Sequence, residues 1–242
     1  MQPFEIKFTI AAHQADSQGR AKPSALLYLC QEAAGGHCGQ LGVDWQILQE
    51  RGLFWALIRT YVQVEKLPVT GQQVTVRTWP MPTTRSAFPR AAVCLDADGN
   101  TLFSATSLWV LMDIQNRRML LPGKSGVELD GITLGCELPP PASIHPVALQ
   151  QQTYRTVAKE DLDRNAHMNN TRYMDWLFDL LPADAPPIKG FTACYLNEAT
   201  DGQHLRLSWQ HTQENILQLE IDRPKDGQPE QTERVFAARV EF

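Results

Sequence analysis

The densest group of polar side chains in the sequence runs from Asp161 to Asn170, between an expected strand and an expected helix. Within it Asp163, Asn165 and His167 alternate, so in an extended segment their side chains would project to one side. A carboxylate, an amide and an imidazole beside the unpaired N–H groups of a helix start are the groups that acyl transfer to water needs. The spacing therefore indicates a candidate hydrolytic site.

A purely structural interpretation of the same residues stays open. Asp and Asn side chains commonly satisfy backbone N–H groups in loops, and such capping accounts well for Asn169 or Asn170. Capping does not account for His167, nor for three different functional groups in register. Spacing alone does not decide between a catalytic and a capping loop.

The hydrophobic pattern predicts the same order of elements twice: a strand, a helix and then four strands. The first half predicts a strand over 4–12, a helix over 24–36 with Ser24 as its N-cap, a short helix over 45–51, and strands over 54–66, 73–79, 87–95 and 101–114. The second half predicts a strand over 151–157, a helix over 170–181, and strands over 191–196, 204–209, 215–221 and 234–242. Gly and Pro interrupt the chain between them. We expect an N-terminal unit over 1–125, a linker over 126–148 and a C-terminal unit over 149–242.

The two halves also match in sequence, which favours an internal duplication. The matches are Asp16 with Asp161 and Tyr28 with Tyr173, an offset of 145, and Gly71-Gln72 with Gly202-Gln203, an offset of 131. With the first offset, Arg20 stands opposite Asn165. Lys22 likewise stands opposite His167. We therefore expect the C-terminal unit to be catalytic and the N-terminal unit to hold substrate.

One main helix and five strands per half suit an antiparallel sheet that curves around its helix. We expect an α+β fold, a tandem (double) hot-dog with two long helices, each wrapped by a curved antiparallel sheet. The candidate site would then lie near a helix N-terminus.

Composition excludes several classes of protein. The chain has 242 residues, 43% of them hydrophobic and 20% charged, which fits a globular protein. Its longest apolar runs fall far short of the roughly 20 residues of a membrane helix. A net charge of −5 argues against nucleic acid as a partner. Five scattered cysteines without a CxxC pair predict neither a metal site nor a disulfide framework.

The sequence also leads to expectations about the cellular compartment and about cofactors. The chain begins at once with an alternating strand pattern, so we expect no signal peptide and a cytoplasmic protein. We expect no cofactor. His37 is expected to be structural, and core packing is the default for Phe54, Trp55 and Trp109, which could also line an acyl tunnel.

Residues of both halves match a known family in combination. The C-terminal half carries Asp163-x-Asn165-x-His167-x-Asn169-Asn170-x-x-Tyr173-x-x-Trp176. The N-terminal half carries Gln31–His37, Leu41–Val43, Trp55, Leu67-Pro68, Thr78–Pro80, Arg90, Gly99, Ala105–Val110 and Asp113. In these residues the chain resembles the acyl-ACP thioesterases, enzymes that end fatty-acid elongation. The resemblance runs from about Phe4 to Glu198.

The resemblance implies a tandem hot-dog that hydrolyses the thioester between a fatty acyl group and the phosphopantetheine arm of acyl carrier protein. By resemblance the catalytic residues are Asp163, Asn165, His167 and the downstream acid Glu198, and the substrate contacts are Asn169, Asn170, Tyr173 and Trp55. Plant members carry a cysteine after that acid, where this chain has Ala199. Water activated by a carboxylate is then the better mechanism, and whether Glu198 or Asp163 is the base stays open.

Other functions and partners need discrimination. We expect no chloroplast transit peptide, and therefore a bacterial form of the family. An acyl-CoA thioesterase and an acyl-thioester-binding sensor are alternatives, and so is a hot-dog enoyl-thioester hydratase, whose Asp-x-Asn-x-x-His pattern is one residue longer. A basic patch for the acidic carrier protein could be formed by Arg85, Arg90, Arg117, Arg118 and Lys124. Either a monomer or a homodimer is compatible with the sequence.

Overall fold

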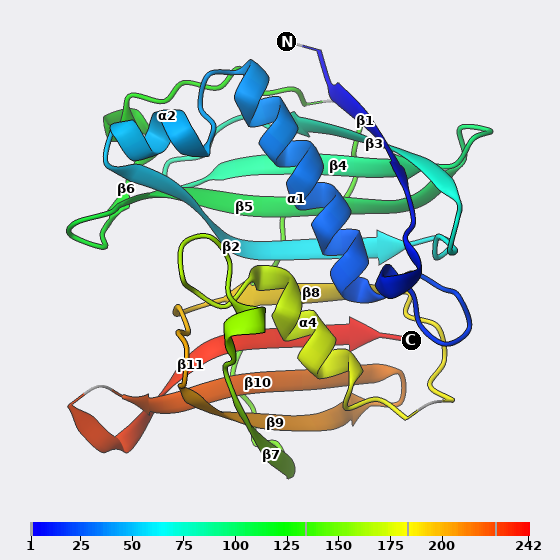
Figure 1. Cartoon of the computed structure of the whole chain (residues 1–242), viewed down its shortest axis with the longest axis vertical. Coiled ribbons are helices and arrows are strands. Elements are labelled where there is room, and N and C mark those ends of the chain that lie inside the picture. Colours follow the sequence, from blue (N-terminus) through cyan, green and yellow to red (C-terminus); the bar gives the residue numbers. More distant parts are fainter. Residues whose placement is uncertain (1, 134, 183, 226) are drawn as a thin grey trace. The chain divides into compact units, whose positions relative to one another are not determined.

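The computed structural model describes residues 2–133, 135–182, 184–225 and 227–242. The chain divides into two compact units, unit 1 over Met1–Pro141 and unit 2 over Ala142–Phe242. This division falls inside the segment that the sequence predicts to be a linker. In each unit a main helix lies on an antiparallel sheet (Figure 1). Among the described residues, no helix combines the length and apolar character needed to cross a membrane.

Unit 1 contains every element that the sequence predicts for the first half. Its strands are β1 (Phe4–Thr9), β2 (Leu53–Val64), β3 (Gln73–Pro80), β4 (Phe88–Leu95), β5 (Thr101–Asp113) and β6 (Met119–Leu120). Its helices are the 3-10 turn η1 (Ala12–Gln14), α1 (Pro23–Gln40), α2 (Trp45–Glu50) and α3 (Pro122–Ser125). The sheet runs β1-β3-β4-β5-β2, with β6 beside β5. The sequence does not predict η1, β6 or α3, which are too short to show a periodic pattern.

Helix α1 spans 18 residues and buries one face, including Leu29 and Ala33, which are spaced by one turn. It begins at Pro23, so the prediction that Ser24 is the N-cap is wrong. The N-cap is Lys22, which makes no side-chain capping bond. Proline at the first helical position has a helical φ and no N–H to be capped, so the helix starts here without a polar side chain.

Unit 2 repeats this architecture with fewer residues. Its strands are β7 (Gln151–Thr156), β8 (Gly190–Tyr195), β9 (His204–Gln213), β10 (Ile216–Lys225) and β11 (Gln228–Glu241), and its helices are the 3-10 turn η2 (Lys159–Asp161) and α4 (Asn170–Phe178). The sheet runs β8-β11-β10-β9-β7, with antiparallel neighbours. Its core includes Met174, Leu177, Phe191, Leu219 and Phe236, all essentially inaccessible to solvent.

Helix α4 is half as long as α1, with nine residues against 18. It ends at Phe178, three residues before the predicted end at Leu181. Leu181 precedes Pro182, and the residue before a proline is disfavoured in helical conformation, so the helix ends early.

The backbone hydrogen bonds of the two units correct the sequence alignment between them. β1 and β7, η1 and η2, and the first residues of α1 and α4 all lie 147 residues apart. The bond from Asp16 N to the Arg20 carbonyl recurs from Asp163 N to the His167 carbonyl. The predicted offset of 145 for this region is therefore wrong, because isolated identities outweighed the element boundaries. The offset of 131 agrees with the starts of β3 and β9.

The N-terminal part of the predicted linker is hydrogen-bonded to the sheet of unit 1. In unit 1, Ile132 N donates to the Pro80 carbonyl (2.9 Å), and the Thr106 hydroxyl donates to the Pro139 carbonyl (2.8 Å). Gly131 lies so close to the backbone of Met81 and Pro82 that an added Cβ would overlap it. This part of the predicted linker is bound to the sheet of unit 1.

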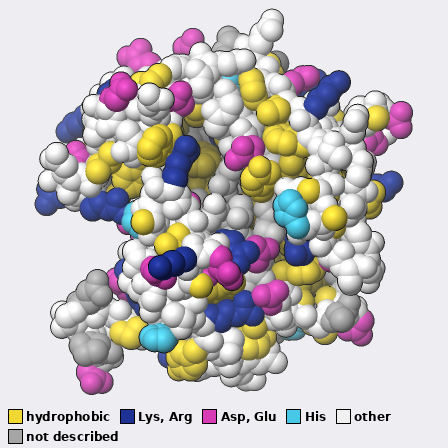
Figure 2. All heavy atoms as spheres, viewed as in Figure 1, with side chains coloured by type: hydrophobic (Ala, Val, Ile, Leu, Met, Phe, Trp, Pro, Cys, Tyr) yellow, Lys and Arg dark blue, Asp and Glu magenta, His cyan; other side chains and the backbone are white. Residues whose placement is uncertain are grey.

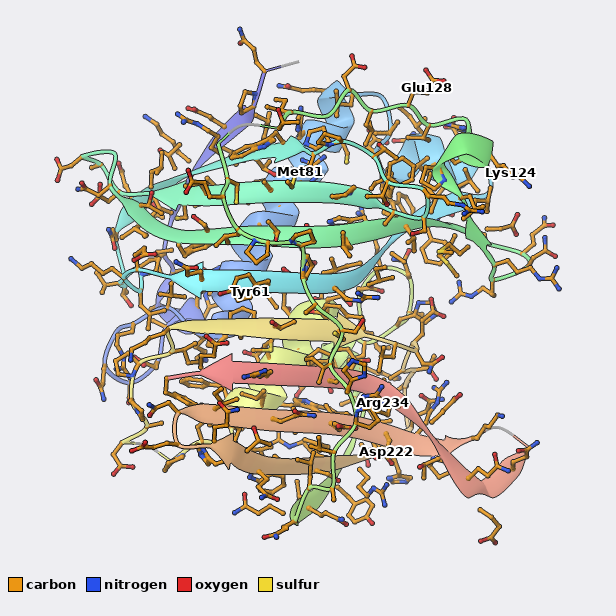
Figure 3. The ribbon with its side chains drawn as sticks, turned by 180° about the vertical axis from the view of Figure 1, so that it is seen from behind. Tyr61, Met81, Lys124, Glu128, Asp222 and Arg234 are labelled. Atoms are coloured by element: carbon orange, nitrogen blue, oxygen red, sulfur yellow. The ribbon has the colours of Figure 1, made fainter. Side chains whose placement is uncertain are left out.

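Residues 142–148 are bound to the sheet of unit 2 in the same way. Arg234 on β11 donates to the Ile144 carbonyl at 3.2 Å, and Gln218 on β10 donates to the His145 carbonyl at 3.0 Å. The segment crosses the face opposite α4, where Figure 3 labels Arg234. The described residues of the linker, 126–133 and 135–148, thus form a strap that is bound to the sheet of unit 1 up to residue 141 and to the sheet of unit 2 from residue 142. They contain no helix or strand.

Candidate active site

The segment with the predicted catalytic side chains is a tight turn. Asp163 N donates to the His167 carbonyl at 2.8 Å, and Ala166 N donates to the Asp163 carbonyl at 3.0 Å. Ala166 has a φ of 61°, in the left-handed region that favours glycine. The prediction that Asp163, Asn165 and His167 project to one side of an extended segment is therefore wrong, because the chain reverses direction between them.

The carboxylate of Asp163 holds this turn together. It accepts hydrogen bonds from Asn165 N (2.7 Å), from His167 N (3.3 Å) and from the Asn165 side-chain amide (3.4 Å). The capping interpretation thus applies to Asp163. It leaves the imidazole of His167 to be explained.

His167 points to the acid that the family resemblance implies. Its Nε2 lies 3.4 Å from Oε2 of Glu198, which is on the loop after β8. The two side chains are 20% and 42% exposed, so both are accessible to solvent. Met168 N donates to the carbonyl of Ala199 at 2.8 Å and ties the two loops together. Residues 31 positions apart in the sequence are thereby brought into contact.

The start of α4 lies directly after this turn. Asn169 is the N-cap, and its side chain accepts from both the N–H and the hydroxyl of Thr171 at 2.9 Å. The Asn170 carbonyl accepts from the Tyr195 hydroxyl at 3.1 Å. The dipole of α4 directs partial positive charge toward the turn. The site thus combines a carboxylate, an imidazole and a helix N-terminus.

Tyr173 is a core residue. It is 3% exposed and stacks on Phe236 with ring centres 4.7 Å apart, and burial raises the pKa of its hydroxyl. Its ring therefore packs α4 against β11 in the core of unit 2.

Asp161 is a supporting residue that the sequence analysis missed. It is 3% exposed, accepts from Ala158 N (3.0 Å), and is ion-paired with Arg172 Nε (2.9 Å). Its carbonyl accepts from Asn169 N at 2.8 Å. Because Arg172 lies on α4, these bonds fix the turn to the helix. A buried carboxylate requires a partner, but Arg172 lies 11 positions away, so spacing alone does not indicate the pair.

The matching turn of unit 1 has the same backbone and different chemistry. Asp16 accepts from Gln18 N and Arg20 N, both at 2.9 Å, and is ion-paired with the Arg20 guanidinium at 2.9 Å. Although burial alone would raise it, these hydrogen bonds hold the pKa of Asp16 below its ordinary value. Arg20 occupies the position of His167, and Gln18 that of Asn165. The earlier pairing of His167 with Lys22 is therefore wrong.

Trp55 belongs to unit 1. Its indole N–H donates to the Val43 carbonyl at 2.9 Å, and its ring meets Phe88 edge-on with centres 5.0 Å apart. These contacts give it a packing role within that unit.

Arg90 does not contribute to a basic surface patch. It is 7% exposed, and its guanidinium donates to His37 Nδ1 (3.2 Å), Thr78 Oγ1 (3.3 Å) and Cys38 Sγ (3.8 Å). His37 is buried, as a structural histidine should be. The other four residues of the predicted patch, Arg85, Arg117, Arg118 and Lys124, are exposed. On the face drawn in Figure 2, described side chains of both charges are interspersed.

Metal ligands are the remaining question about the site. Among the residues that the structure describes, no group of three or more His, Cys, Asp or Glu side chains is placed to bind a metal ion.

Comparison with known proteins identifies close matches to both units. The model of the acyl-ACP thioesterase N-terminal domain matches residues 2–121, and that of the acyl-ACP thioesterase C-terminal domain matches residues 145–236. An acyl-ACP thioesterase from Bacteroides thetaiotaomicron is 25% identical with a TM-score of 0.88, over 99% of this chain and 97% of that one. The 12:0-ACP thioesterase from Umbellularia californica is 25% identical with a TM-score of 0.80, over 99% and 95%. These likenesses confirm the predicted fold class, an α+β tandem hot-dog.

Curated relatives include longer proteins. The chloroplastic palmitoyl-acyl carrier protein thioesterase of Gossypium hirsutum is 28% identical over 194 residues, 74% of this chain and 47% of that protein. The chloroplastic dodecanoyl-[acyl-carrier-protein] hydrolase of Umbellularia californica is 26% identical over 231 residues, 84% of this chain and 58% of that protein. The chain thus spans about half the length of the curated relatives it matches.

Proposed function

Because the chain belongs to the acyl-ACP thioesterase family, we propose that it hydrolyses fatty acyl-ACP thioesters to a free fatty acid and the carrier protein. The observation that carries the proposal is the contact between His167 Nε2 and Glu198 Oε2 at 3.4 Å, on two loops that a backbone bond ties together. Both groups are accessible, and hydrolysis of a thioester needs a base and a polarising group beside the carbonyl.

Glu198 is the proposed base. The carboxylate of Asp163 accepts three hydrogen bonds from its own turn, so its role is to hold His167 and Asn165 in place. Glu198 is the more exposed carboxylate and faces the imidazole. It takes a proton from water, and the water oxygen attacks the thioester carbonyl. Ala199 follows it where plant members carry a cysteine, which supports water as the nucleophile.

Asn165 and His167 orient the water in this mechanism. In the first turn of α4, the N–H groups of Thr171 and Arg172 are bonded to Asn169, so the N–H of Asn170 is the proposed donor to the negative oxygen of the tetrahedral intermediate. Loss of one such donor typically costs ~10²–10³ in rate. Collapse of the intermediate breaks the C–S bond and expels the phosphopantetheine thiolate, which takes up the proton that Glu198 received from water and leaves as the thiol.

Substrate contacts and partners extend this proposal. We propose Asn169 and Asn170 as contacts beside the reacting carbonyl, with Tyr173 and Trp55 as apolar walls in their respective units. Unit 2 is the catalytic half and unit 1 holds substrate. Acyl carrier protein is the partner, the protein is a monomer or a homodimer, and the setting is cytoplasmic.

Thiol release tests the proposal. The purified protein is incubated with acyl-ACP and acyl-CoA thioesters of varied chain length, and free thiol is measured. We expect His167→Ala, Asp163→Ala and Glu198→Gln each to lower kcat by about 10² or more while the fold is kept. The matched control is His204→Ala, an exposed histidine of the same unit that contacts Thr156.

Several results would contradict the proposal. Wild-type turnover in His167→Ala would remove its central residue. Release from acyl-CoA alone would replace the carrier protein as partner. Hydration of an enoyl thioester without thiol release would indicate a hydratase, and tight binding without turnover would indicate a sensor.

A further inference from the structure

The carboxylate of Glu198 depends on its loop for direction. Its side chain is 42% exposed, so packing does little to orient it. The loop runs from the end of β8 to the start of β9, and residues 197 and 198 are exposed within it. Whatever fixes the Glu198 backbone therefore fixes the distance between the carboxylate and His167.

The loop is held on both sides of Glu198, by Asn197 N and its side-chain amide on the carbonyls of Val235 (3.2 Å) and Arg234 (2.7 Å), and by Met168 N on the carbonyl of Ala199 (2.8 Å). An arginine of β10 contacts Glu198 itself. Arg223 Nη1 donates to the carbonyl of Glu198 at 2.7 Å and to the side-chain oxygen of Gln203 at 2.8 Å. On its other side the guanidinium is ion-paired with Glu233 of β11 at 2.8 Å, and Arg223 is only 14% exposed. One planar, rigid group thus spans the two ends of the loop and is itself anchored to the sheet.

The turn itself closes without such an arginine. In unit 2 the Gln203 side chain accepts from Thr200 N at 3.0 Å, and in unit 1 the Gln72 side chain accepts from Val69 N at the same distance. The bond from the preceding glycine also recurs: Gly202 N donates to the Val157 carbonyl after β7 at 2.9 Å, and Gly71 N donates to the Ile10 carbonyl after β1 at 2.8 Å. The glutamine is therefore sufficient to form this turn.

The arginine and the acid are both specific to unit 2. With the offset of 131, Leu67 occupies the position of Glu198. The strand pairing places Asp96 at the position of Arg223. Asp96 accepts from the N–H groups of its own hairpin turn. Where the acid is absent, so is the arginine.

We propose that Arg223 is a positioning residue that holds the Glu198 backbone so that the carboxylate faces His167. The inference rests on the proposed function, since it requires Glu198 to act in the reaction. It assigns Arg223 no contact with substrate. We call the hydrogen bonds from Arg223 to Glu198 and Gln203 the clamp. A displacement of about 1 Å at a reacting group can cost ~10² in rate, so loss of the clamp should lower kcat.

The first experiment compares Arg223→Gln with Arg155→Gln in the thiol-release assay. Arg155 is an arginine of the same unit that pairs with Asp179 on the surface. We expect Arg223→Gln to lower kcat by about 10-fold or more with KM little changed, and Arg155→Gln to leave both unchanged. Arg223→Lys keeps the positive charge but lacks the planar guanidinium with its several N–H donors, so it should retain only part of the wild-type kcat.

The second experiment is a double-mutant cycle with Glu198→Gln. If Arg223 acts through Glu198, Arg223→Gln should have little further effect on kcat once Glu198 is Gln. An equal loss of kcat in both backgrounds would overturn the proposal, because it would show a general structural effect. Wild-type kcat in Arg223→Gln would overturn it as well.

A third variant covers the case in which Arg223→Gln does not fold. Glu233→Gln keeps the arginine and removes its anchor, and it should lower kcat less but in the same direction; an unchanged kcat would count against the clamp. Failure of the proposed function gives a different pattern. In that case Glu198→Gln itself keeps wild-type turnover, whatever the arginine variants show.

Discussion

The buried histidine of unit 1 should make stability depend on pH. His37 is 3% exposed, stacks on Phe4 with ring centres 5.6 Å apart, and accepts a hydrogen bond from Arg90 at Nδ1. Burial first, and then the neighbouring Arg90 guanidinium, lower the pKa of His37 from 6.5 to about 4. An Nδ1 that accepts a hydrogen bond carries no proton, so this packing suits only the neutral imidazole.

The sign and size of the effect follow from proton linkage. In the unfolded chain the pKa of His37 returns to about 6.5, so below that pH the unfolded state binds a proton that the folded state does not. The free energy of unfolding therefore falls as the pH drops from 6.5 toward 4, and this contribution is flat above 6.5. Between pH 7.5 and pH 5.0 the contribution of His37 amounts to about 2 kcal/mol.

Urea unfolding of the wild type and of His37→Gln at these two pH values isolates this contribution. Glutamine can still accept a hydrogen bond from Arg90 but does not titrate. Four of the six tryptophans, at positions 45, 55, 79 and 109, lie in unit 1, so fluorescence reports on its unfolding. The wild type should lose about 2 kcal/mol more than the variant on acidification. Parallel losses in the two proteins would refute the reasoning.

Two further predictions concern backbone positions. Gly131→Ala should lower the free energy of unfolding by about 1–3 kcal/mol, because the new Cβ would overlap the Met81 and Pro82 backbone, whereas Gly123→Ala, which meets nothing within 4 Å, should be tolerated. Equal denaturation midpoints for the two variants would contradict the tight packing of the strap. Ala166 and Gly19 share the same left-handed backbone, with φ of 61° and 77°, so Ala166→Gly should stabilise and Gly19→Ala destabilise, each by about 0.5–1 kcal/mol in urea unfolding. Effects of the same sign would show that strain at this turn is not the cause.

The regular elements could be predicted from sequence because their signals are local. Alternating apolar residues place β1 to β5 and β7 to β11, and the helical pattern over residues 24–36 places α1. Helix ends were less accurate, since Pro23 and Pro182 act through single φ/ψ restrictions that periodicity does not register. The strap lacked a signal altogether, because its hydrogen bonds are made to distant strands.

The site could be predicted only where residue type and spacing mark it. The side chains of Asn165, His167 and Glu198 are accessible to solvent, and their residue types and spacing match a family motif, so the sequence identifies them. Arg223 reaches the Glu198 carbonyl from 25 positions away across two strands, so nothing near either residue indicates the contact. The burial of Arg90 could not be predicted from the sequence either, because its uncharged partners, His37 and Thr78, lie on other elements.

The duplicated turn separates what the fold requires from what the chemistry requires. Asp16 and Asp163 each accept hydrogen bonds from the N–H groups two and four residues on, so this carboxylate belongs to the turn whether or not the unit has a catalytic role. One change between the copies alters what the turn presents: Arg20, which pairs with Asp16, corresponds to His167, which points to Glu198 instead. A loss of activity on removing Asp163 would therefore not identify it as the base, because the turn that presents His167 would be lost with it. The replacements at His167 and Glu198 leave that turn intact, and they are the ones that report on chemistry.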